Sequence, residues 1–244
     1  MHKNYEIFDT ELGKIAITHS KRARRIIFRG ENGAITMVVP FYFEGTTEYL
    51  RSLVEQNRGA LKRLLSKATA RHTDSQLYDG RQIEIVEGTL LLRADNSVGR
   101  SRVRTRREDK HITFSFHPDD ITSSSFQAGL SRYIMRTLTT QYGTRLRQMT
   151  HDLASQWGLK IKAVRVGRGQ RVLGHCSRTG IITISAFVLL LPQHLREYII
   201  LHELAHLTHF DHSAAVHALC NKYCQGNEAT WRGELRKFVF PISL

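Results

Sequence analysis

The sequence predicts an α+β protein, with a β-rich N-terminal half followed by a half that combines a small sheet with several helices. Up to about residue 118, short runs rich in β-branched and aromatic residues alternate with turn residues, a pattern typical of strands. From Ser123 onward the apolar residues recur with the helical period. The composition changes at Pro118-Asp119-Asp120, so the expected regions are 1–118 and 119–244, either separate or joined by one core.

At the N-terminal end, Asn32-Gly33 is a strong hairpin signal between two expected strands. Thr46 then precedes an amphipathic helix that is expected to end near Leu65. The polar residues 66–80 predict a loop. The strands expected before this helix cover residues 5–8, 14–18, 25–29 and 34–39.

Three further strands are expected over residues 82–86, 90–94 and 112–116. Arginine occupies every second position before the last of them, so in an extended chain these side chains share one face. They fit a charged edge strand that resists aggregation, a phosphate-binding face for nucleotides or nucleic acid, or plain surface charge. The candidate anion-binding residues are Arg100, Arg102, Arg104 and Arg106.

The C-terminal region predicts a helix from Ser123 to about Trp157, with an interruption near Gly143. Strands are expected at 160–166 and 180–185, with a loop at 174–177. Three helices follow, at 192–210, 213–223 and 228–238. The sequence shows no internal repeat.

The bulk composition suggests a basic, cytoplasmic protein without a membrane span. The net charge of +14 favours an anionic substrate, surface or nucleic acid as partner, but it does not bear on fold. Three cysteines argue against a disulfide framework and fit a reducing compartment. No apolar run approaches the ~20 residues of a membrane helix, and the first six residues lack the apolar stretch of a secretion signal. The oligomeric state is left open.

One short motif carries chemistry: His202-Glu203-Leu204-Ala205-His206 matches H-E-x-x-H. On a helix, residues four apart project from the same face, so both imidazoles can bind one zinc ion. Glu203 is rotated away from the pair but remains close enough to act as general base on a zinc-bound water. His212 follows six residues later and completes a three-histidine site that leaves one position for water. His209 stands where a glycine often makes the turn, and is a candidate second-shell or surface residue.

The stretch Tyr198–Leu207, followed by Asp211–Ser213, resembles the YgjP-like metal-dependent hydrolases, which are relatives of the SprT-type zinc metallopeptidases. The segments Gly174–Ser177 and Gly180–Ile184 resemble a W-G-S-C-S…G-x-(I/L)-x-(L/I)-N pattern of that family. Residues from Ser20 to Pro40 resemble its opening, and the match is loosest across 41–160. The resemblance implies a zincin-like catalytic half, a zinc ion and a peptide or protein substrate.

The sequence departs from the family pattern on the substrate side. Leu173 and His175 replace a Trp and a Ser, and Val216 and His217 stand where Phe-Trp is usual. The metal-binding residues and Glu203 are intact. The candidate substrate-side or second-shell residues, besides His209, are His175, Cys176 and Ser177.

Three functions therefore compete. The first is a zinc peptidase whose substrate pairs with the 181–185 strand. The second is a metal-dependent hydrolase of another substrate, such as a nucleoside triphosphate, since nucleotide hydrolysis has been ascribed to YgjP relatives. The third is a nucleic-acid-associated module with a vestigial zinc site, although structural sites usually have four protein ligands. A second metal site at His217, Cys220 and Cys224 is conceivable, but cysteines four apart on an amphipathic helix are more often core residues.

Overall fold

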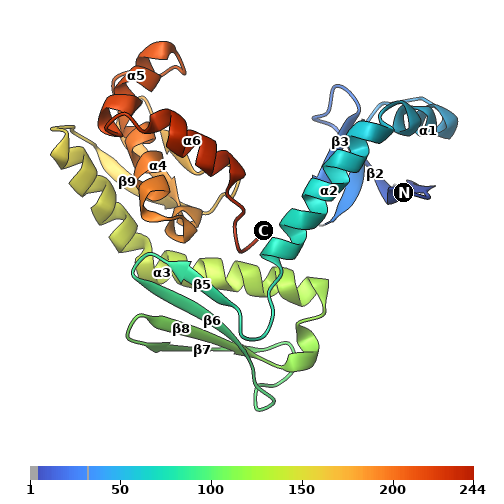
Figure 1. Cartoon of the computed structure of the whole chain (residues 1–244), viewed down its shortest axis with the longest axis horizontal. Coiled ribbons are helices and arrows are strands. Elements are labelled where there is room, and N and C mark those ends of the chain that lie inside the picture. The colour runs from blue at the N-terminus through green and yellow to red at the C-terminus, as the bar shows by residue number, and fades with distance from the viewer. Residues whose placement is uncertain (1–4, 32) are drawn as a thin grey trace. The chain divides into compact units, whose positions relative to one another are not determined.

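A computed structural model describes residues 5–31 and 33–244 of the chain (Figure 1). Residues 1–4, which belong to the segment searched for a secretion signal, and Asn32 of the expected hairpin turn lie outside the described residues. The structure confirms the mixed α and β composition. It divides the chain into two compact units, Met1–Ser75 and Gln76–Leu244. This division differs from the expected boundary at residue 118, because the strands between 82 and 116 share a core with the C-terminal helices.

The first unit is built on a four-stranded sheet with the order β1-β2-β4-β3. Two antiparallel hairpins meet through the parallel pairing of β2 and β4. Ile15 and Ile17 on β2 and Ile35 and Met37 on β4 alternate with more exposed residues and are buried against the helices of this unit. The strands are β1 (Tyr5–Asp9), β2 (Gly13–Ser20), β3 (Ile27–Glu31) and β4 (Ala34–Pro40).

Two helices, α1 (Thr47–Gln56) and α2 (Arg58–Ser75), cover this sheet. The Thr46 hydroxyl accepts the Tyr49 N–H at 3.2 Å, so Thr46 caps α1 as predicted. The expected loop from residue 66 is wrong, because α2 continues to Ser75. Ala68 is buried, and a Cβ on Gly30 of β3 would lie 2.9 Å from the Ala68 Cβ. This close approach of helix and strand supplies the tertiary contact that a polar sequence window does not reveal.

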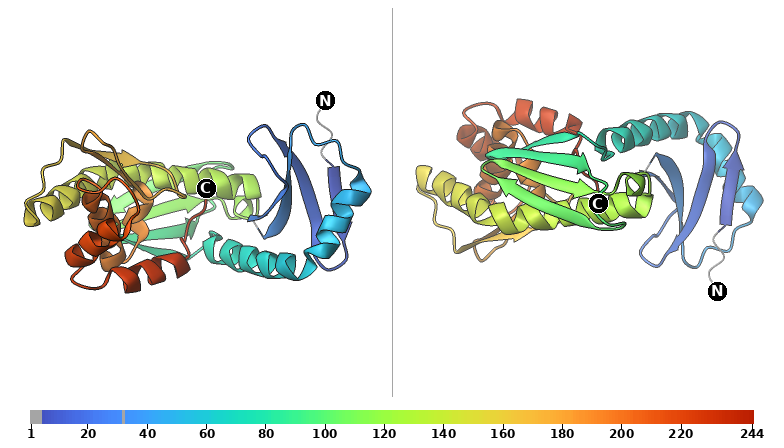
Figure 2. Two further views of the ribbon diagram at one scale, coloured as in Figure 1. Left: turned by 90° about the horizontal axis from the view of Figure 1, so that it is seen from above. Right: turned by 90° about the horizontal axis from the view of Figure 1, so that it is seen from below.

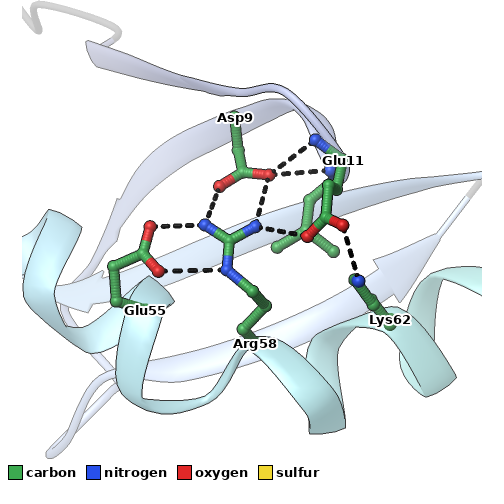
Figure 3. Close-up of polar contacts among 6 residues, drawn as sticks. Asp9, Glu11, Glu55, Arg58 and Lys62 are labelled. Atoms are coloured by element: carbon green, nitrogen blue, oxygen red, sulfur yellow. Dashed lines mark hydrogen bonds and ion pairs between the residues drawn. The ribbon is translucent and has the colours of Figure 1, made fainter.

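An ionic cluster joins the β1–β2 turn to the two helices of the first unit (Figure 3). Asp9 is buried and accepts the backbone N–H groups of Glu11 and Leu12. The Arg58 guanidinium contacts Asp9 at 2.7 Å, Glu11 at 2.8 Å and also Glu55. The Leu12 N–H and the Arg58 side chain hold the pKa of Asp9 below its usual value, against the opposing effect of burial.

The second unit begins with a sheet of the same topology, with the order β5-β6-β8-β7. Again two antiparallel hairpins meet through a parallel central pair, here β6 and β8. The sequence shows no repeat because this topology depends on turn positions and strand alternation and not on residue identity. The strands are β5 (Gln82–Ile85), β6 (Gly88–Ala94), β7 (Val103–Glu108) and β8 (His111–Phe116).

The long helix α3 (Ser124–Gln156) packs in the same core as this sheet (Figure 1). It runs without the interruption expected at Gly143. A Cβ at Gly143 would lie 3.7 Å from Val166, an ordinary packing distance, so this glycine is not required by close approach. Packing of α3 against β9 (Ala163–Gly167) and the buried 3-10 turn Ala186–Leu190 outweighs the ~1 kcal/mol helix cost of glycine.

A three-stranded sheet with the order β10-β11-β9 precedes the last helices. β11 (Ile181–Ser185) is the central strand, parallel to β9 and antiparallel to β10 (Gly174–Cys176). The loop expected at 174–177 is thus largely an edge strand. Three helices follow in the order α4 (Gln193–Ala205), α5 (Ala214–Tyr223) and α6 (Glu228–Lys237), drawn from orange to red in Figure 2. Of these, α4 packs against α3, and α5 and α6 pack against α4. Within the described residues, no helix is long and apolar enough to cross a membrane.

Candidate metal centre

Three imidazoles converge at the C-terminal end of α4. His202 lies in its last turn, His206 is the C-cap residue, and His212 lies in the segment before α5. Their candidate ligand atoms all lie within 4.8 Å of one another. Among the side chains that the structure describes, this is the one group of three or more His, Cys, Asp or Glu that could hold a metal ion.

The geometry of the three rings fits a divalent metal ion. The Nε2 atoms of His202 and His206 are 3.3 Å apart. Two nitrogen ligands of a tetrahedral zinc ion, each ~2.0–2.1 Å from the metal, lie about 3.4 Å apart. The ring planes of His206 and His212 meet at 88°, so these imidazoles do not stack. Two neutral imidazole nitrogens this close repel one another unless a cation or a proton lies between them, and a metal ion satisfies this requirement.

The backbone next to His206 sets the tautomer of its ring. The His206 Nδ1–H donates a hydrogen bond of 2.8 Å to the carbonyl oxygen of His209. This leaves the Nε2 lone pair free to face the metal site. His209 therefore contributes a carbonyl group to the site, a role that its residue type did not reveal.

Glu203 lies on α4 between the two helix ligands and faces β10. Its side chain is buried, and its carboxylate accepts the backbone N–H of Cys176. Burial raises the pKa of Glu203 to about 7, and the Cys176 N–H acts in the opposite direction. A Cβ on Gly174 would lie 2.4 Å from Oε1 of Glu203, so only glycine leaves room for this carboxylate.

The carboxylate and two of the imidazoles open into one cleft of about 260 Å³. The predicted residues His175 and Cys176 line it. Burial, followed by the charge of Glu203, raises the pKa of Cys176 to about 11, so this side chain is a neutral thiol at neutral pH. The cleft is lined by Gly174, His175, Cys176, Glu203, His206, Phe210 and His212.

The residues that line the cleft differ from the sequence-based expectation at Ser177 and Phe210. Ser177 is not among its lining residues; the Ser177 hydroxyl accepts the Ile181 N–H at 3.0 Å and stabilises the β10–β11 turn. Phe210, which sequence reasoning missed, lines the cleft with 47% of its surface exposed. The Arg178 guanidinium lies 5.9 Å from the centre of its ring. The only sequence signal for Phe210 was an aromatic residue two positions before His212.

The arginine series does not form a continuous ladder. Arg100 and Arg102 precede β7, whereas Arg104 and Arg106 lie on it with exposed side chains. β7 is an edge strand, as one interpretation required. The ion pairs in this region join Arg100 to Asp119 at 2.8 Å and to Asp120 at 2.7 Å, Arg104 to Asp95 at 3.4 Å, and Arg106 to Glu108 at 2.6 Å.

The side chains considered for a second metal site belong to other contacts. The His217 Nδ1 lies 3.1 Å from the Glu228 carboxylate. Cys220 and Cys224 are buried in the core, with their sulfur atoms 3.9 Å apart. Contact with Cys224 and burial both raise the pKa of Cys220, which disfavours a thiolate ligand. In the described part of the chain, these residues form no metal-binding cluster.

A metal site of three histidines beside a buried carboxylate is the arrangement of a metal-dependent hydrolase. The chain belongs to the YgjP-like family: the model for the YgjP-like metallopeptidase domain matches residues 24–237. Among solved structures, the metallopeptidase zymogen abylysin of Pyrococcus abyssi matches with 23% identity and a TM-score of 0.34. That match covers 40% of this chain and 99% of abylysin. A search of curated proteins gives no match.

Proposed function

We propose that the protein is a zinc-dependent metallopeptidase in which Glu203 is the general base. The observation that carries the proposal is the position of the Glu203 carboxylate, in one cleft with His206 and His212 and next to the edge strand β10. The all-imidazole donor set with an open fourth position is typical of catalytic zinc. His202, His206 and His212 would hold the ion.

The metal ion and Glu203 would each contribute a different part of the proposed reaction. When bound, zinc supplies a Lewis acid that polarises the substrate carbonyl and lowers the pKa of water. Glu203 accepts the proton of the attacking water and passes it to the leaving amine. Its buried setting keeps bulk water away from the carboxylate, and Gly174 keeps the space that the carboxylate occupies.

The peptide substrate is proposed to pair with β10. The sequence-based expectation of pairing with residues 181–185 is wrong, because β11 already has a neighbour on each side. The Leu173 carbonyl and the Ser177 N–H face β11 through hydrogen bonds to Ser185 and Ile181. Antiparallel strands alternate, so the backbone groups of Gly174 and Cys176 point to the free edge. The Cys176 N–H already donates to Glu203, so the Gly174 N–H and C=O and the Cys176 C=O are the groups available to a substrate strand.

The test compares metal-loaded protein on casein, a peptide library and nucleoside triphosphates, with Glu203→Gln as control. Peptide-bond cleavage that requires both metal and Glu203 is the expected result. Phosphate release without peptide cleavage would instead select the nucleotide-hydrolase alternative. That alternative gains no support from the arginine series, because Arg100, Arg104 and Arg106 pair with carboxylates of their own sheet region.

A further inference from the structure

A second cleft lies at the opposite end of α4 from the metal ligands. Its volume is about 350 Å³, and it is walled by α3, the start of α4 and the β5–β6 turn. Its lining combines apolar residues with groups of both charges. The lining residues that matter are the apolar Val86, Met149 and Leu153 and the charged Asp152, Arg196 and Glu197.

Arg196 is the unusual member of this lining. Only 8% of its surface is exposed. Nη2 of its guanidinium donates to the Leu191 carbonyl at 3.1 Å, whereas its buried Nε has no acceptor among the described residues. Burial lowers the pKa of Arg196 more than the nearby charges of Glu197 and Glu87 raise it, so the charged form is only partly compensated where it lies. A buried guanidinium that forms no ion pair is costly unless an anion completes it.

The backbone at this end of α4 also favours an anion. Pro192 is the N-cap residue and offers no side-chain cap, and the first turn carries no acidic residue. The first N–H groups of a helix lack acceptors within the helix and carry partial positive charge. Gln193, the first helical residue, lines the cleft. The helix terminus and the incompletely bonded Arg196 therefore favour an anionic group at the same end of the cleft.

Carboxylates of the cleft favour a cation as well. Asp152 accepts the side-chain amide of Gln148 at 2.7 Å, and Glu197 accepts that of Gln193 at 2.8 Å. Neither carboxylate forms an ion pair in the described part of the chain, although the charge of Glu197 acts on Arg196 and partly offsets the effect of its burial. Glu87 differs, because it pairs with Arg145. The cleft thus presents a guanidinium and two carboxylates that form no ion pair in the described part of the chain, beside an apolar wall.

We propose that this cleft binds a small zwitterion, an α-amino acid or short peptide with an aliphatic side chain. Its carboxylate contacts Arg196 and the start of α4. Its ammonium group contacts Asp152 or Glu197, and its side chain packs against Met149 and Leu153. Such a ligand matches the charges of both signs without adding net charge, whereas a simple anion would meet three carboxylates and a simple cation two guanidinium groups.

Binding is tested with the full-length protein by titration calorimetry and by methyl NMR of Met149. The probes are leucine, Leu-Leu, N-acetyl-leucine and leucinamide, and the first two distinguish a free amino acid from a peptide. Leucine or Leu-Leu is expected to bind at least tenfold more tightly than N-acetyl-leucine, which lacks the ammonium group, and leucinamide, which lacks the carboxylate. Equal affinity for all four probes, or no binding of any, would overturn the proposal.

Variants separate this cleft from the metal centre, since amino acids also chelate metal ions. Arg196→Met and Asp152→Asn are each expected to weaken binding at least tenfold, both in metal-loaded protein and after chelator treatment. Arg147→Met, an exposed change on the same helix as Asp152, is the matched control and should bind as the native protein does. Asp152 is exposed, so its variant tests the site even if Arg196→Met impairs folding. Retained binding in Asp152→Asn, or loss of binding that follows metal removal alone, would contradict the assignment.

Discussion

At the scale of single residues, Glu203 has the most specific proposed role. Glu203→Gln keeps the shape of the side chain and the neighbouring ligands but removes the proton acceptor. We expect kcat on a cleaved peptide to fall about 10²–10⁴-fold, with metal content unchanged. Steady-state kinetics and metal analysis of the same preparations measure both quantities, and a fully active Glu203→Gln would disprove the general-base role.

His212 is the proposed ligand furthest from the motif and the most exposed of the three histidines. His212→Ala removes one of three donors, so metal affinity is expected to fall by more than about 100-fold, because even the loss of an outer-shell partner costs 10–100-fold. Competition with a chromophoric chelator measures the change. His175→Ala is the control, because His175 lines the same cleft but is not part of the ligand cluster. Equal affinities of the two variants would remove His212 from the ligand set.

The convergence of His202 and His206 was predictable from sequence because spacing within one helix fixes relative position, whereas the placement of His212 beside them depends on the turn after α4. His202 and His206 are one turn apart, so the motif alone places both rings on one face. The roles of Phe210 and of the His209 carbonyl were not predictable, because they depend on how the chain turns after α4. The same holds for Arg196, since its burial is a property of the assembled fold.

At the scale of secondary-structure elements, the packing of β10 on α4 determines where Glu203 lies. In Gly174→Ala, the new Cβ would lie 2.4 Å from Glu203 Oε1, so the carboxylate must move. We expect kcat to fall at least tenfold while the protein still binds metal, which activity and metal assays can show. Gly129→Ala, where a Cβ meets nothing within 4 Å, is the matched control. If both variants retain native kcat, Gly174 does not position the carboxylate.

Element boundaries were predicted less well than element types. The helical period of residues 123–157 predicted both ends of α3 to within one residue. The extension of α2 to Ser75 was missed because its last residues are polar. The strand β10 was missed because it has only three residues and begins with a glycine. In these cases a neighbouring element, β3 or β11, determines the conformation.

At the scale of the whole molecule, the ionic cluster in Figure 3 links the stability of the first unit to pH. The pKa values of Asp9 and Glu11 are lowered in the folded state. Their contribution is therefore fully present above the unfolded pKa of about 4 and is lost as pH falls through the lower folded values. We expect amide exchange in β2 and β4 to accelerate relative to the intrinsic rate as pH falls from 5 to 3.

Arg58→Met should weaken this acid dependence, because the guanidinium is one of the groups that lower both pKa values. Lys14→Met is the control, since it removes only the exposed pair with Glu6. Hydrogen-exchange mass spectrometry resolves the peptides of the first unit within the full chain. An unchanged pH dependence in Arg58→Met would show that the cluster does not link pH to stability.

The domain boundary could not be read from composition because the change at Pro118 marks only the passage from strands to helices. Two sheets of one topology lie on either side of Ser75, and each is buried by helices that follow it in the chain. Because α3 buries the second sheet, this sheet shares one hydrophobic core with α4, the helix that carries His202. The composition break at Pro118 therefore marks a change of secondary structure and not the boundary between two hydrophobic cores.

The position of His212 in the short connection between α4 and α5 has a mechanical consequence. An ion held by His202, His206 and His212 would cross-link the end of one helix to the approach of the next, across a loop of only a few residues. Such a cross-link would restrain the Leu207–Ser213 segment, in which Phe210–Ser213 are exposed, so a protease would cut it more readily after loss of the ion. The lifetime of the protein in a cell would then depend on the supply of the ion, as its catalytic activity also would.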